Sequence, residues 1–394
     1  MTRSHLVGAS LLLILSSLGR PLDAQPVRFE CDTVFRIDGY EAEFSALRSV
    51  AAGPENQVAV SERLSRSVRL FDSLGRKGPD LGREGQGPGE FTGIGSLGWV
   101  SDSIWAFDAR LDRFTLFGSG GGEEGFRTYR REERAAWAPP GSGMPSFAVV
   151  LPRALYPDGS VLGSLLTPLS ENAGGGSTIG LVGPGGELRR IVARYSGPDG
   201  FVRHGGDGRA VGWSYPFEHD PVMDVAPDGS ALSLAVVATV EDSDCVIVLR
   251  RFDASGDTVF TRSLRVEGET IPEDVREEAL LESADRLYSQ VGSSKWRREY
   301  LQNDRTPGVY PPARDIVAGS KGRTWLGVRK ARVGVEYYAF GPGGEIEGIL
   351  RLPGNARLVE ARGNRLWAVE KDGYDVESLM GLRLRRGGDA PGNH

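Results

Sequence analysis

The sequence contains few of the side chains from which reactive and metal-binding sites are usually built. It has two cysteines, Cys31 and Cys245, and four histidines among 394 residues. Two cysteines far apart in the sequence do not form the disulfide framework that stabilises a small secreted domain. Whether they pair depends on the distance between their Cα atoms, which the sequence leaves open. The spacing His-x-x-x-His, typical of zinc sites, is also lacking.

Positive charge is in short supply as well. The chain carries 47 lysines and arginines against 53 aspartates and glutamates, a formal net charge of −6. Proteins that bind nucleic acids display a basic patch or stripe, and no block of basic residues stands out here. We therefore expect no nucleic-acid partner.

Long apolar runs are lacking after the first residues. Residues 1–24 combine Arg3, an apolar stretch from Leu6 to Leu18 and a small residue at Ala24, which predicts a secretory signal peptide. No later stretch approaches the roughly 20 apolar residues of a membrane-spanning helix. We expect no transmembrane segment after signal cleavage and a location in the periplasm or outside the cell.

Glycine, in contrast, is abundant: 55 residues, spread evenly along the chain. Even spacing of glycine predicts many tight turns between short strands. Six segments share one pattern of strand, polar turn, strand and glycine turn, and a unit of about 40 to 50 residues with four strands is typical of a propeller blade. The segments are 49–76, 97–122, 154–188, 223–257, 316–346 and 359–388.

The predicted fold is all-β: a six-bladed β-propeller of four-stranded antiparallel blades, forming a single domain over residues 25–388, with a flexible tail at 389–394. Stacking sheets around an axis buries faces that a lone small sheet would expose. The last unit runs out of chain, while residues 34–37 belong to no complete unit. We therefore expect this N-terminal strand to close the last blade.

A helical insertion is predicted at about 270–303. Thr270 and Glu273 have the spacing of a capping box, with Pro272 at the first helical position. A second short helix is predicted at 295–301. The insertion either covers a site as a lid or packs on its own blade.

The stretch GREGQGPGEF, residues 82–91, raises the question of a phosphate-binding loop. Such a loop requires a lysine followed by serine or threonine and then a helix, whereas this stretch leads into a strand-like sequence. Glycine and proline also allow a tight crossing between blades. We interpret the stretch as architecture.

The same stretch and the residues after it resemble the NHL-type repeat. Asp108, Arg113 and Phe114 occupy the Asp…Arg-Phe positions of that repeat. More broadly, the mature chain resembles secreted bacterial six-bladed β-propeller proteins. The resemblance implies a fold more strongly than a function, because propellers carry out unrelated chemistries.

One loop concentrates acids around a histidine. Glu218, His219, Asp220 and the nearby Asp224 either form a metal site or an acid–base pair, or belong to a solvated loop. No cofactor is predicted from this pattern, although a divalent metal is left open.

Aromatic side chains and arginines in expected loops are the other candidates. Tryptophan, tyrosine and arginine are favoured anchors of binding interfaces, but large aromatic residues also wedge between blades. With the histidine and aspartate above, the binding candidates are Trp213, Tyr215, Phe217, His219, Asp220, Tyr310 and Arg314.

No catalytic constellation is evident, and no catalytic residue is assigned. The sequence favours a binding module for a protein, a peptide or a glycan. The alternatives are a metal-assisted lyase or lactonase-like hydrolase working in the central channel, and a purely structural envelope protein.

Overall fold

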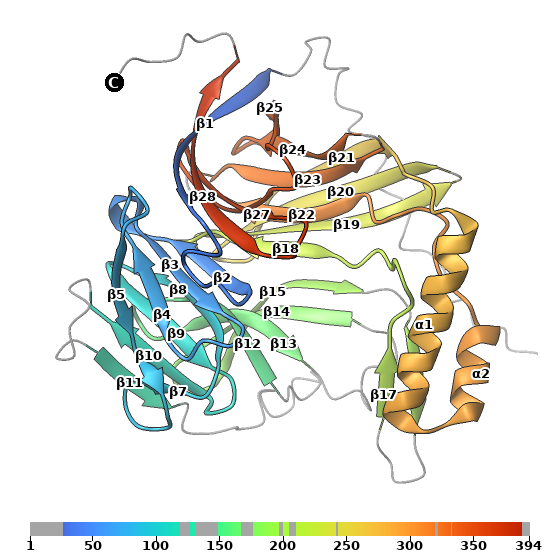
Figure 1. The fold of residues 1–394 in the computed structure, drawn as a ribbon, viewed down its shortest axis with the longest axis horizontal. Coiled ribbons are helices and arrows are strands. Elements are labelled where there is room, and N and C mark those ends of the chain that lie inside the picture. Colours follow the sequence, from blue (N-terminus) through green and yellow to red (C-terminus); the bar gives the residue numbers. More distant parts are fainter. Residues whose placement is uncertain are drawn as a thin grey trace, which may run out of the picture.

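The chain forms short strands separated by glycine turns, as its composition predicts. The computed structural model describes residues 27–118, 126–130, 149–166, 176–196, 200–204, 210–241, 243–319, 322–331 and 333–387. The predicted signal peptide and tail lie outside this part. Two α-helices accompany the strands of the described part (Figure 1).

Four sheets each consist of four strands that follow one another in the chain and pair antiparallel. The first is β2 (Leu47–Ala52), β3 (Val58–Glu62), β4 (Val68–Phe71) and β5 (Lys77–Leu81). The second is β8 (Ile94–Val100), β9 (Ser103–Asp108), β10 (Arg113–Phe117) and β11 (Phe126–Arg130). The third is β12 (Val149–Leu155), β13 (Val161–Leu166), β14 (Gly176–Val182) and β15 (Leu188–Ser196). The fourth is β18 (Val222–Val225), β19 (Ala231–Glu241), β20 (Asp244–Asp253) and β21 (Thr258–Glu267).

The remaining long strands form one eight-stranded sheet that also contains the N-terminal strand. Its order is β22-β23-β24-β25-β1-β28-β27-β26. Its bounds are β22 (Ala313–Ala318), β23 (Thr324–Lys330), β24 (Gly334–Phe340), β25 (Ile346–Arg351), β1 (Arg28–Ile37), β26 (Arg357–Arg362), β27 (Arg365–Lys371) and β28 (Glu377–Arg386).

The two ends of the chain meet in this sheet. Strand β1 pairs antiparallel with β28 from Phe29 opposite Arg386 to Ile37 opposite Leu379. Its contact with β25 is parallel and holds only two register pairs. The predicted pairing of the N-terminal strand with the last strand is confirmed, and this strand is longer than the predicted segment 34–37 (Figure 1).

The strands that open each group of four stand next to one another around an axis. These first strands are β2, β8, β12, β18, β22 and β26, and each contacts the next, with β26 contacting β2. Buried apolar clusters lie between neighbouring sheets. On the second strands, Trp105, Trp325 and Trp367 are almost completely buried. The arrangement is therefore propeller-like.

The glycine stretch at residues 82–91 folds into a tight crossing between the first two sheets. Strand β6 (Arg83–Glu84) pairs in parallel with β7 (Glu90–Phe91). Gly82 has a φ of +79°, and a Cβ there would lie 2.4 Å from the Phe91 ring. The Arg113 guanidinium donates to the Gln86 carbonyl at 2.7 Å, so the buried arginine of the repeat pattern stabilises this loop.

Asp108, the acid of the same pattern, organises the segment after the glycine stretch. Its Oδ2 accepts the N–H groups of Thr92 at 2.6 Å and Gly93 at 3.1 Å, and its Oδ1 accepts that of Leu111 at 3.1 Å. Burial raises the pKa of this carboxyl, but the N–H donors outweigh burial and leave the pKa below its usual value. The contacts of both residues are structural, as the architectural interpretation predicts.

The helical insertion is present, with different ends. Helix α1 covers Glu273–Val291 and α2 covers Ser294–Gln302. The predicted capping box is wrong: Pro272 lies at the N-cap without a side-chain cap, and Thr270 instead forms a β-bridge with Val309. A proline pre-sets the backbone for helix entry without supplying a capping oxygen.

The insertion packs against a hairpin that the sequence did not reveal. Strands β16 (Phe201–His204) and β17 (Ala210–Trp213) form this hairpin in the connection before β18 (Figure 1). Phe201 and Tyr215 share a buried cluster with Leu287 and Tyr300 of the helices. Two separate insertions thus bury one another.

Cys31 on β1 and Cys245 on β20 are both free. Neither helix in the described residues has the length and apolar character that crossing a membrane requires.

Phe35 tests whether β1 holds the structure together. This ring is buried, and Gly75 and Gly381 leave room for it, since a Cβ at Gly381 would lie 2.2 Å from the ring. We expect Phe35→Ala to lower the free energy of unfolding by about 3 to 5 kcal/mol, measured by urea denaturation. Tyr374→Ala is the control, because Tyr374 is 86% exposed. Equal stability of the two variants would contradict a central role for β1.

Candidate functional site

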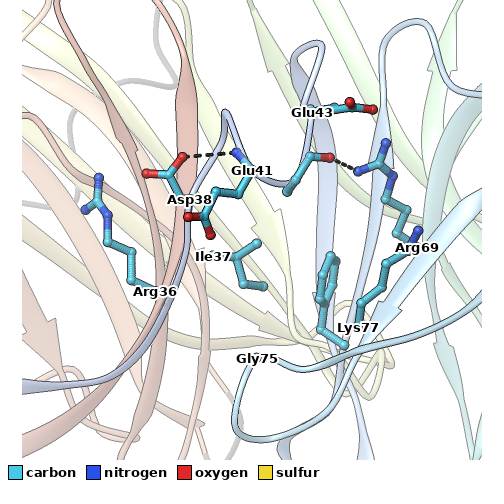
Figure 2. Close-up of a pocket in the computed structure, with 10 residues that line it drawn as sticks. Arg36, Ile37, Asp38, Glu41, Glu43, Arg69, Gly75 and Lys77 are labelled. Carbon is cyan, nitrogen blue, oxygen red and sulfur yellow. Dashed lines mark hydrogen bonds between the residues drawn. The ribbon is translucent and has the colours of Figure 1, made fainter.

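A pocket lies where the turn after β1 approaches β4 and β5 (Figure 2). Its volume is about 370 Å³. It therefore lies beside the strand pairing that joins the two chain ends. The residues that line it are Arg36, Ile37, Asp38, Glu41, Ala42, Glu43, Arg69, Phe71, Gly75 and Lys77.

The turn that forms one wall is tightly determined. Asp38 Oδ1 accepts the N–H groups of Tyr40 at 2.8 Å and Glu41 at 3.2 Å. Gly39 is required because a Cβ there would lie 2.2 Å from the Glu377 carbonyl oxygen. Glu43 adopts a φ of +54°, a conformation uncommon for a residue with a side chain. The backbone thus holds Glu41 and Glu43 at the pocket.

The basic side chains of the pocket already have anionic partners. Arg36 pairs with Glu370, and Lys77 Nζ lies 3.1 Å from Asp80 Oδ2. Arg69 Nε lies 2.8 Å from Glu62 Oε1, and its guanidinium also donates to the Ala42 carbonyl (Figure 2). Their positive charge is largely compensated within the protein.

Three of the residues that line the pocket are acidic. Within the described residues, no lysine, arginine or histidine forms an ion pair with Asp38, Glu41 or Glu43. Ionised carboxylates accept strong hydrogen bonds from ammonium and guanidinium groups. The pocket therefore presents uncompensated negative charge to a cationic group.

Two of the sequence-predicted binding residues pack on the helical insertion. Trp213 Nε1 donates to Ser283 Oγ at 3.0 Å. Tyr215 is buried and stacks on Tyr300 with ring centroids 4.5 Å apart and planes at 10°. Burial in this cluster raises the pKa of Tyr300 to about 12. These contacts give the two rings a packing role.

Three other candidates come together at the base of the insertion. The Phe217 and Tyr310 rings meet edge to face at 5.2 Å, and His219 Nε2 lies 3.1 Å from the Val309 carbonyl oxygen. Asp220 and Arg314 are exposed. A ligand-binding role for all seven candidates stays a prediction.

The acids around His219 do not all come together, although Glu218 and Asp220 lie within electrostatic reach of each other. Burial raises the pKa of Glu218, whereas Asp224 lies on β18 and contacts β22. No group of three or more histidine, cysteine, aspartate or glutamate side chains able to hold a metal occurs among the residues that the structure describes.

Asp224 and Glu360 accept backbone N–H groups of the first strands, whose inner edges pair with no other strand in the described part of the chain. The Ala318 N–H donates to Asp224 Oδ2 at 2.9 Å, and the Ala361 N–H donates to Glu360 Oε1 at 2.9 Å. Burial raises the pKa of Asp224 to about 6. Burial, and then the charge of Asp224, raise the pKa of Glu360. A carboxyl with such a pKa can exchange a proton near neutral pH. Glu360 had no motif by which the sequence could identify it.

Asp224 should make stability depend on pH. Its pKa of about 6 in the folded protein exceeds the ordinary value of an aspartate carboxyl, 3.8, so the folded state holds the proton more tightly. The stability that this group contributes at low pH is therefore lost as the pH rises through about 4 to 6.

We expect Asp224→Asn, which keeps an acceptor for the Ala318 N–H, to be more stable than the wild type at pH 8 by about 1 to 3 kcal/mol. The difference should vanish near pH 4, and urea denaturation at both pH values measures it. Asp274→Asn, exposed on α1, is the control. A pH-independent difference for Asp224→Asn would contradict the buried-carboxyl interpretation.

No protein-family model matches the chain, and no curated protein matches it. Several solved structures are similar over most of their length. A catalytically inactive virginiamycin B lyase from Staphylococcus aureus is 12% identical, with 90% of this chain and 99% of that chain covered and a TM-score of 0.42. A member of the DUF4221 family from Bacteroides vulgatus is 12% identical, with 92% and 100% covered and a TM-score of 0.48. The aldose sugar dehydrogenase of Streptomyces coelicolor is 15% identical, with 92% and 100% covered and a TM-score of 0.43. At these values the likeness assigns neither an activity nor a ligand to this chain.

Proposed function

We propose that the protein is a secreted six-bladed β-propeller that acts as a binding module. The count of six is supported by the six first strands that contact one another in turn. It is also supported by the short parallel contact between β1 and β25, which divides the eight-stranded sheet into two groups of four. Secretion is supported by the signal-like sequence of residues 1–24.

The ligand is a peptide or protein segment that carries a positive charge, bound in the pocket beside the chain ends. The main observation in support of this ligand is that Asp38, Glu41 and Glu43 line a pocket of about 370 Å³ without an ion-pair partner among the described residues. Arg36 and Arg69 are held by Glu370 and Glu62 and so do not neutralise these acids. A lysine or arginine side chain, or a free amino terminus, supplies the missing charge.

Trilysine is the probe, titrated calorimetrically against the purified protein. We expect saturable binding that weakens at least about tenfold when Glu41→Gln and Glu43→Gln are combined, because two charge-assisted contacts are lost. Glutamine keeps the size of the side chain and the backbone requirements of the turn.

The matched control is Glu282→Gln, an exposed acid on α1 far along the chain from the pocket. A second control ligand is triglutamate, which the pocket should reject. Absence of saturable trilysine binding, or equal binding by the double variant and the control variant, would overturn the proposal.

A lyase or hydrolase with its site among the first strands is the second proposal. The observation that favours it is the pKa of Asp224, about 6, beside the carboxyl of Glu360. However, the N–H groups of Ala318 and Ala361 donate hydrogen bonds to these acids, which gives both carboxyls a structural role that requires no substrate. We therefore place the binding function first.

A further inference from the structure

Three exposed arginines occupy matching places on neighbouring first strands. On three of the second strands, Ala59, Trp325 and Trp367 lie opposite Ala51, Val317 and Glu360 of the first strands. Three residues before these partners, in the same order, the chain has Arg48, Arg314 and Arg357.

The three arginines lie near the beginnings of strands that adjoin one another. Strand β22 contacts β26, and β26 contacts β2. Arg48 and Arg314 also sit at register shifts between the first and second strands. Such bulges leave a residue unpaired and re-aim its side chain. Arg357 is instead paired with Val369, and the shift in its strand lies between Leu358 and Glu360. The three positive charges therefore lie near the beginnings of three adjoining strands, without an identical register.

These charges have no anionic partner in the part of the chain that the structure describes. Arg48 Nε donates to the Gly95 carbonyl at 3.2 Å, on the neighbouring strand β8. No carboxylate of the described residues forms an ion pair with Arg48, Arg314 or Arg357. All three side chains are exposed.

Asp315, an acid within electrostatic reach of two of the arginines, does not neutralise them. Asp315 Oδ2 accepts the Tyr337 hydroxyl at 3.2 Å, and its Oδ1 is buried without a hydrogen-bond partner. Burial raises the pKa of Asp315 to about 6, while Arg314 and Arg357 act in the opposite direction, so both guanidinium groups lie within electrostatic reach of it. Arg314 and Arg357 together outweigh this one carboxyl, which leaves an excess of positive charge beside it.

We propose that Arg48, Arg314 and Arg357 form a binding site for a doubly charged oxyanion group, a phosphate or a sulfate. Guanidinium groups present a planar fork of N–H donors that matches the oxygens of such groups. An anion also relieves the repulsion among like charges on adjoining strands. This site is separate from the pocket proposed for cationic segments and uses none of its residues.

The test is calorimetric titration with sodium sulfate and, separately, sodium phosphate at constant ionic strength. We expect saturable binding of both ions by the wild type. Arg314→Gln and Arg357→Gln should each weaken it at least about fivefold, because each removes one charge-assisted contact. Arg357→Lys keeps the positive charge but not the planar fork of donors, so it should lose less affinity for the anion than Arg357→Gln.

Arg298→Gln, an exposed arginine on α2, is the matched control and should bind as the wild type does. The double variant of Glu41 and Glu43 should also bind sulfate normally, which separates a failure of this site from a failure of the pocket. Thermal unfolding of each variant verifies the fold. Absence of saturable binding of both ions would overturn the proposal, as would unchanged affinity in both glutamine variants.

Discussion

The pairing of β1 with β28 is the interaction on which the arrangement of the sheets depends. These strands come from opposite ends of the chain and pair over nearly the whole of β1. Without β1, the last group of strands would lack its fourth member, and Phe35 and Ile37 would leave the cluster they share with the first sheet. Closing the ring in this way satisfies the hydrogen bonds of strand edges that would otherwise invite aggregation.

Closure does not pair the inner edges of the sheets: among the described residues, no strand lies beside the inner side of a first strand. The carboxylates of Asp224 and Glu360 accept N–H groups there. Burying an acid disfavours its charged form, and this cost appears as the raised pKa of both groups. The perturbed titration of these acids thus follows from the geometry of the ring.

The two proposed binding sites share a physical origin in uncompensated charge. At the turn after β1, arginines are held by acids of the sheets, which leaves Glu41 and Glu43 free to meet a cation (Figure 2). Near the beginnings of β2, β22 and β26, Arg48, Arg314 and Arg357 form no ion pair with the acids that the structure describes. The modest net charge of the chain therefore hides local excesses of both signs.

The sequence by itself determined the strands and turns of the six repeated segments and the presence of the helical insertion, because these follow from glycine spacing and from the period of apolar residues over a few neighbours. It also identified the pairing of the chain ends, since one unit lacked a strand and one strand lacked a unit. It did not reveal the β16–β17 hairpin or the exact ends of the helices. Only the tertiary structure decided which charges are compensated. From the sequence, Trp213 and Tyr215 were predicted to be aromatic residues in loops, yet they pack on helices that lie some 70 to 85 residues further along the chain. Glu41, Glu43, Arg48 and Arg357 belonged to no motif. Their environment comes from residues distant in the chain, and no local pattern encodes which partner a charge will meet after folding.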